Sequence, residues 1–213
     1  SLSNQTNVRA KFNTGTFKHT LSTGVDVSRE TSFARRGATG TETADVEIDT
    51  VAFYAFDTIE LSRQWQLSGG VRVEHYDLDF AGHRLFNVGL NQGIISRSQS
   101  ETTVGGKIGL AYKPVDNGTF YASYGLSHLP PGSLLSNPDI AREGGNAFPG
   151  FVPGADPVEL HNYEVGVKWD WFGGKLSTTA ALFHTEKKNV GYPNPATGSL
   201  NPDIVYGRQV VQG

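Results

Sequence analysis

Short connections alternate with long ones along the whole chain, and this pattern restricts the fold more than any other feature of the sequence. The short connections fall near Thr14-Gly15, Arg63-Gln64, Asp116-Asn117-Gly118 and Gly173-Gly174. The long connections fall near residues 31–45, 80–100, 129–158 and 189–204. In a meander of antiparallel strands, this alternation collects all tight turns at one end of the sheet and all long loops at the other. The two ends of the predicted sheet are therefore different.

Between these connections, apolar and polar residues alternate with period two, which is the pattern of strands and not of helices. Residues 65–76 show it clearly, with Trp65, Leu67, Val71 and Val73 opposed to Gln66, Ser68, Arg72 and Glu74. The pattern predicts strands at residues 6–14, 17–30, 46–61, 65–76, 103–113, 119–128, 161–171 and 174–188, and a ninth that starts near Val205. Within 46–61 the apolar positions change phase, which predicts a β-bulge near Asp57.

The composition narrows the class of protein further. A net charge of −3 with no basic run argues against a nucleic-acid partner. The absence of cysteine excludes a disulfide scaffold and thiolate metal sites. No stretch approaches 18 consecutive apolar residues, so no transmembrane helix is expected. The chain has no methionine and starts without a signal-peptide pattern, and we interpret it as an internal piece of a longer protein.

A soluble β-sandwich also alternates apolar and polar residues, so the sandwich is the alternative to a membrane barrel. The predicted strands are long, at about ten to fifteen residues, whereas strands in globular proteins average about five or six. Charged residues such as Arg72, Lys107 and Glu164 lie in mid-strand on the polar face, as a wet lumen permits. Aromatic residues gather beside the short turns, as in the interfacial girdle of a membrane barrel. The expected girdle consists of Phe12, Phe17, Trp65, Tyr112, Phe120, Trp169 and Trp171.

We therefore predict an all-β, antiparallel transmembrane barrel segment of about eight or nine long meandering strands. The short turns would be periplasmic and the long loops extracellular, in the outer membrane of a Gram-negative bacterium. The sheet is expected to be open at both edges, with no substantial helix. The expected outward band at the short-turn end includes Phe12, Trp65, Tyr112, Trp169 and Trp171.

Several segments resemble TonB-dependent siderophore receptors. The strongest resemblance runs from Tyr163-Glu164-Val165-Gly166-Val167-Lys168-Trp169-Asp170 through Gly174-Lys175-Leu176-Ser177 to Lys187-Lys188-Asn189. Others are Trp65-Gln66-Leu67-Ser68-Gly69-Gly70-Val71-Arg72, His19-Thr20-Leu21-Ser22-Thr23-Gly24 and Thr119-Phe120-Tyr121-Ala122-Ser123-Tyr124-Gly125. Together they cover most of the strands and little of the loops, and the long loops resemble the catecholate-type branch.

This resemblance implies a 22-stranded barrel, an N-terminal plug inside it and a periplasmic energy-coupling motif. The sequence shows no plug-like segment and no coupling motif, so residues 1–213 are interpreted as one partial barrel domain. The implied function is energised uptake of a ferric siderophore. The implied partners are the siderophore, the TonB complex acting through the plug, and outer-membrane lipid and lipopolysaccharide. The alternatives are a passive outer-membrane porin and a structural or adhesin barrel.

A ferric siderophore is often anionic and aromatic, so its receptor would present arginines and aromatic rings near the outer mouth. The topology brings nine candidates there: Arg35, Arg36, Tyr76, Phe80, Arg84, Arg142, Phe148, Phe151 and Tyr192. Each could instead be an ordinary solvated loop residue.

No enzyme, cofactor or metal site is expected. The six histidines are spread widely, and His75 with Asp77 shares a strand face near the rim, where both would simply be solvated. A hydrolase would need a nucleophile elbow of the G-x-S-x-G type, which the chain lacks, and Ser127 and His128 are adjacent and so point to opposite faces.

Overall fold

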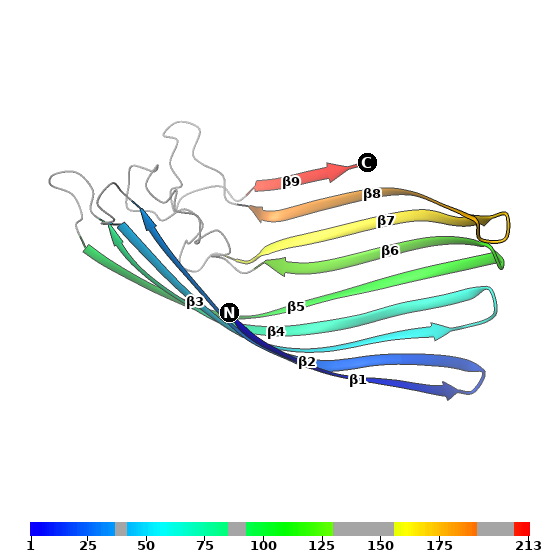
Figure 1. Ribbon diagram of the computed structural model, residues 1–213, viewed down its shortest axis with the longest axis horizontal. Coiled ribbons are helices and arrows are strands. Elements are labelled where there is room, and N and C mark those ends of the chain that lie inside the picture. Colours follow the sequence, from blue (N-terminus) through cyan, green and yellow to red (C-terminus); the bar gives the residue numbers. More distant parts are fainter. Residues whose placement is uncertain (37–41, 85–92, 130–155, 191–206) are drawn as a thin grey trace.

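The computed structural model describes residues 1–36, 42–84, 93–129, 156–190 and 207–213, which form nine antiparallel strands in one curved sheet (Figure 1). The strands are β1 (Leu2–Thr14), β2 (Phe17–Arg36), β3 (Glu42–Glu60), β4 (Trp65–Arg84), β5 (Gly93–Val115), β6 (Gly118–Leu129), β7 (Val158–Trp171), β8 (Leu176–Val190) and β9 (Gly207–Gln212). Each strand pairs with its neighbours in sequence order, and β1 and β9 are the two edges. The predicted antiparallel meander is confirmed. No helix in the described ranges is long and apolar enough to cross a membrane.

Four tight connections join the strands at one end of the sheet, at the right of Figure 1. They join Thr14 to Phe17, Glu60 to Trp65, Val115 to Gly118 and Trp171 to Leu176. The last of these turns needs three consecutive left-handed residues, Phe172 at φ 54°, Gly173 at 67° and Gly174 at 86°. Glycine adopts this conformation without steric cost, which explains the Gly-Gly pair.

The strands reach further toward the long-loop end than the sequence pattern predicted, and most of all in one half of the sheet. Strands β2 to β5 contain 20, 19, 20 and 23 residues, whereas β6, β7 and β8 contain 12, 14 and 15. Strand β4 was expected to end near residue 76 and continues to Arg84. The pattern failed there because the faces exchange polarity partway up the strand, as described below.

The predicted bulge near Asp57 is wrong. The pairing of β3 with both neighbours runs through Asp57 without a break, opposite Leu21 on one side and Gly69 on the other. Asp57 is a polar residue on the apolar face, and its carboxylate lies 2.6 Å from Nδ1 of His19. The apparent change of phase arose because both faces of β3 carry aromatic residues, Phe53 on one and Tyr54 on the other. The irregularities in register lie instead between Tyr112 and Val115 and between Lys187 and Val190.

The two faces of the sheet differ in exposure as well as in polarity. Along β4, Val71 and Val73 are 55% and 40% exposed, whereas Tyr76 and Leu78 on the other face are 0% and 1% exposed. Side chains converge on the concave side of a curved sheet and splay apart on the convex side, so the less exposed set lies on the concave face. The concave face carries the even-numbered residues of β2, β3 and β4 and the odd-numbered residues of β5, because the register pairs them directly.

Candidate functional site

The convex face carries an apolar band that begins at the short turns. On β2 the band runs from Phe17 to Val27, and on β4 it runs from Trp65 to Val73. The ten steps from Phe17 to Val27 span about 33 Å along the strand at roughly 3.3 Å per residue. A strand tilt of about 40° reduces this to roughly 25 Å, the height of the lipid-facing band of an outer-membrane barrel.

Aromatic rings line the short-turn border of this band. Phe12 stacks on His19 with ring centroids 4.7 Å apart, and Trp65 stacks on Tyr112 at 4.5 Å. Further along the border, Phe120 and Trp171 contact Trp169 at 6.2 and 5.9 Å. The register puts all of these on the convex face, with Phe17 paired to Thr14 at the first turn. Their role as a girdle at the membrane interface remains a prediction.

Above the band, toward the long-loop end, the convex face of β3 and β4 becomes acidic. Arg29 donates two hydrogen bonds to Asp49, at 2.7 and 2.6 Å, and lies 3.6 Å from Glu47. The hydrogen bond from Arg29 lowers the pKa of the Asp49 carboxyl. The other acidic residues on this surface are Asp45, Asp77 and Asp79. Such a charged surface belongs in water, so we expect the tall half of the sheet to extend beyond any lipid that covers the apolar band.

At the same height, the concave face becomes apolar and buried. Val46, Leu78 and Phe80 are 4%, 1% and 1% exposed, and Tyr76 is fully buried beside them. The Tyr76 hydroxyl donates a hydrogen bond of 3.1 Å to Glu101. Burial, with the Glu101 contact as a further cause, raises the pKa of the Tyr76 phenol. The sequence signal for this cluster is the change after Glu74, where the even-numbered residues of β4 turn from polar to apolar.

Lower on the concave face, charged side chains bridge strands that are not adjacent. Arg72 on β4 contacts Asp26 on β2 by reaching across Ala52, which is fully buried between them on β3. Arg72 also donates hydrogen bonds of 3.0 and 2.7 Å to Glu74. Sequence reasoning missed this network, because its members are 46 residues apart and only the register brings them together.

Glycines on this face make room for aromatic rings on the next strand. A Cβ at Gly70 would collide with the backbone of Ala55 and the ring of Phe56, and one at Gly166 would come within 2.6 Å of the Tyr121 ring.

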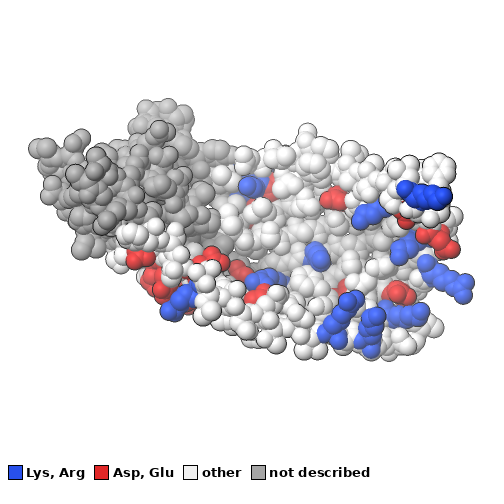
Figure 2. All heavy atoms as spheres, in the orientation of Figure 1, with Lys and Arg blue, Asp and Glu red and all other residues white. Residues whose placement is uncertain are grey.

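Lysine and arginine gather at the short-turn end of the molecule (Figure 2). The register gives the concave face Arg9, Lys11, Lys18, Lys107 and Lys168.

The predicted ligand-binding residues are only partly placed. Tyr76 and Phe80 belong to the buried concave cluster, four positions apart on β4 with Leu78 between them. The backbones of Arg35, Arg36 and Arg84 lie at the long-loop ends of β2 and β4. In the register, Arg35 pairs with Thr43, and Thr43 pairs with His83, so the two strand ends are separated only by β3. The remaining four candidates lie outside the described residues: Arg142, Phe148, Phe151 and Tyr192.

Metal-ligating residues do not converge in the part of the chain that the structure describes, where no group of three or more suitable side chains could hold an ion. His75 Nε2 lies 3.7 Å from Asp77 on the exposed convex face. His161 lies between Tyr124 and Glu159, at 2.9 and 3.1 Å.

Comparison with known proteins agrees with this architecture. The family model described as TonB dependent receptor-like, beta-barrel matches residues 1–213. The catecholate siderophore receptor Fiu of Escherichia coli O6:H1 is 30% identical over the whole chain, which covers 32% of that receptor. The probable TonB-dependent siderophore receptor PiuA of Acinetobacter baumannii is 30% identical over 68% of the chain and 18% of its own length. The crystal structure of Fiu from E. coli K12 in its closed form superposes with a TM-score of 0.77 at 27% identity, covering 99% of this chain and 34% of that one.

The chain is thus part of the wall of an outer-membrane β-barrel. It belongs to the TonB-dependent receptor family, and it spans about a third of the length of the curated relatives that it matches.

Proposed function

We propose that the full-length protein takes up a ferric siderophore across the outer membrane, with energy supplied through TonB. The observation that carries this proposal is similarity along the entire chain to receptors that are named for catecholate siderophores. This segment would form nine strands of the barrel wall. A plug elsewhere in the protein would contact TonB, and the convex band would contact outer-membrane lipid and lipopolysaccharide.

Within this proposal, the ligand approaches at the tall end of the concave face. Arginine supplies charge-assisted hydrogen bonds to an anionic chelate, and aromatic rings supply cation–π and stacking contacts. The arginines at the ends of β2 and β4 support this assignment, together with the buried rings of Tyr76 and Phe80. Because these two rings are already buried, they would form the floor beneath the ligand-contacting residues.

The three arginines are not equivalent candidates. Arg36 follows the concave residue Glu30 by an even number of positions, as Arg84 follows Phe80, so period-two alternation predicts a concave role for both. The same count assigns Arg35 to the convex set. We expect Arg36→Ala or Arg84→Ala to weaken an anionic chelate by about 1.5–3 kcal/mol, the worth of a charged hydrogen bond. Arg35→Ala serves as the matched control and should have almost no effect.

The proposal is tested by growth. The full gene is restored in an iron-starved strain that lacks its own receptors, and purified siderophores are supplied one at a time. Growth should require both a siderophore and the inner-membrane energy coupler. Uptake that persists without the coupler, or diffusion of unrelated solutes without any siderophore-dependent growth, would support the passive porin instead.

A further inference from the structure

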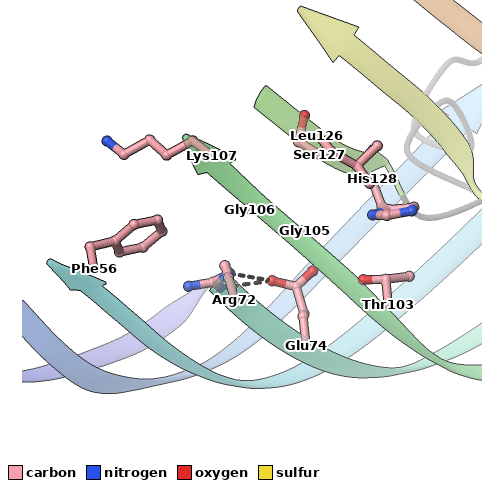
Figure 3. Close-up of a pocket in the computed structure, with 10 residues that line it drawn as sticks. All are labelled: Phe56, Arg72, Glu74, Thr103, Gly105, Gly106, Lys107, Leu126, Ser127 and His128. Carbon is pink, nitrogen blue, oxygen red and sulfur yellow. Dashed lines mark hydrogen bonds and ion pairs between the residues drawn. The ribbon is translucent and has the colours of Figure 1, made fainter. Parts of the chain in front are cut away.

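A hollow of about 280 Å³ on the concave face lies where β5 and β6 separate (Figure 3). Both cross-strand neighbours of Lys107 are glycines, and its ammonium lies 5.1 Å from the centre of the Phe56 ring. Arg72 donates hydrogen bonds to Glu74 and contacts Asp26. The lysine and the arginine of the hollow are therefore both engaged by side chains of the wall itself.

The opposite, convex face of the tall half carries carboxylates that the wall does not neutralise. Above the apolar band, the register pairs Asp49 with Asp77, and in the next row it pairs two more carboxylates, Glu47 and Asp79. Like charges directly opposite each other destabilise a sheet. Arg29 contacts Asp49 and Glu47. Asp79 has no cation within ion-pair distance in the part of the chain that the structure describes. These pairs therefore leave hydrogen-bond acceptors available to whatever covers the convex face.

Neutral hydroxyls and one phenyl ring border these carboxylates. On β5, Ser100 lies opposite Asp77. In the next row, Ser98 lies opposite Asp79. One row further toward the long loops, the side chain of Phe33 on β2 is 64% exposed. The convex face thus combines carboxylate acceptors, hydroxyls and an exposed ring above the apolar band.

We define this surface as the convex platform, which consists of Phe33, Asp45, Asp77, Asp79, Ser98 and Ser100. It covers three rows of residues on four neighbouring strands. At roughly 3.3 Å per residue and about 4.8 Å between strands, it measures about 13 Å along the strands and about 14 Å across them. This area accommodates several linked sugar rings.

We propose that the convex platform binds the sugar chain of outer-leaflet lipopolysaccharide. The proposal rests on the membrane placement in the proposed function, because the platform begins directly above the level of Val73, where the apolar band ends. A carboxylate only accepts hydrogen bonds, and sugar hydroxyls donate them without bringing a negative charge. The ring of Phe33 offers an apolar surface to the C–H face of a sugar. A phosphate is repelled by the same carboxylates, so the sugars and not the phosphates make the contact.

The test uses the purified full-length protein in lipid nanodiscs, without any siderophore. One set of nanodiscs contains lipopolysaccharide with its complete core oligosaccharide, and the other contains lipopolysaccharide truncated after its first sugars, which keeps the lipid phosphates. Carbodiimide and an amine label accessible carboxylates, and mass spectrometry follows the rate of labelling at each one. Asp77 and Asp79 report the platform, and Asp116, exposed at a short turn, is the control.

The complete core should slow the labelling of Asp77 and Asp79 by about tenfold relative to the truncated form, as expected for one hydrogen bond to a charged group. The labelling of Asp116 should not change. Equal rates at Asp77 and Asp79 in the two kinds of nanodisc overturn the proposal. The slowing should also persist when divalent cations are chelated. Its loss on chelation overturns the proposal, because the carboxylates would then act through cations bound to phosphate.

Variants of two exposed rings separate recognition from simple screening by a sugar layer. Phe33→Ala should remove most of the slowing, and Phe33→Tyr, which keeps the ring, should retain it. Phe172→Ala is the matched control, because Phe172 is 77% exposed but lies at the short-turn end. Slowing that is unchanged in Phe33→Ala overturns the proposal, because the sugars would then only screen the surface. The platform can fail this test while siderophore uptake holds, and the reverse.

Discussion

The tall half of the sheet, β2 to β5, and the short half, β6 to β9, are built on the same apolar band and differ in what lies above it. In the tall half, the convex face of β3 and β4 becomes acidic above the level of Val73, and the concave face becomes an apolar cluster around Tyr76. In the short half, β6 ends at Leu129, only a few residues above its ring contact between Tyr124 and Tyr163. This difference predicts that lipid covers the convex band, that water lies on the concave side beside it, and that the membrane ends where the two faces exchange polarity.

The largest effect is expected from a charge placed in the convex band. Val71→Arg puts a guanidinium on the lipid-facing side in mid-band. We expect it to destabilise the protein in a bilayer, lowering the free energy of unfolding by about 2–4 kcal/mol. His75→Arg, four residues higher on the same face of β4, should cost only about 0–1 kcal/mol because it lies at or above the interface. Denaturant titration of the full-length protein in liposomes measures both. Equal costs would show that the band does not end where the convex face becomes polar.

A smaller effect on stability is expected when neighbouring glycines on the two faces of β4 are each changed to alanine. Gly70→Ala on the concave face drives a methyl group into Ala55 and Phe56, and overpacking of this kind costs about 1–3 kcal/mol. Gly69→Ala on the convex face meets nothing closer than 3.5 Å and should be tolerated. The same titration compares them, and a tolerated Gly70→Ala would mean that the ring of Phe56 is not packed over the glycine.

Tyr76→Phe tests the buried cluster of the tall half. Loss of the hydrogen bond to Glu101 should cost about 0.5–1.5 kcal/mol. Because burial raises the pKa of the phenol, the fold favours the neutral form, and the stability from Tyr76 is complete below about pH 10 and declines as the pH rises further. Unfolding measured at pH 8 and pH 11 should show a larger loss in the native protein than in Tyr76→Phe. An equal loss in both proteins would place the Tyr76 side chain in water.

The smallest effect is expected on the convex surface of the same half. Arg29→Ala removes the contacts to Asp49 and Glu47, all of which are exposed to solvent. Exposed ion pairs of this kind contribute little, so we expect no measurable change in the unfolding midpoint. A clear loss of stability would indicate that this surface is covered in the full-length protein.

The band could be predicted from the sequence because lipid on one side and water on the other impose a strict period of two. Above Glu74 the convex face becomes polar and the concave face apolar, so the pattern predicts an end to β4 eight residues too early. For the same reason, the sequence indicates a ligand contact at Tyr76 and not a buried cluster. The apparent phase change near Asp57 has another cause, because both faces of β3 carry aromatic residues. Asp57 itself lies in the band, where its partner is His19, 38 residues away. The hollow at Lys107 could not be predicted, since it depends on two glycines brought alongside by register and on the point where β5 and β6 separate.

The central claim is that the two faces of one strand exchange polarity at the edge of the membrane, and β4 tests it directly. This chain has no cysteine of its own. In a cysteine-free background of the full-length protein, single engineered cysteines from position 65 to position 84 can therefore carry nitroxide labels in a bilayer. Collisions with oxygen report lipid, and collisions with a water-soluble nickel complex report water. We predict oxygen access at odd positions up to 73, nickel access at odd positions from 75, and access to neither reagent at 76, 78 and 80. Oxygen access that alternates unchanged to position 84, or that falls on the even positions, would contradict the account.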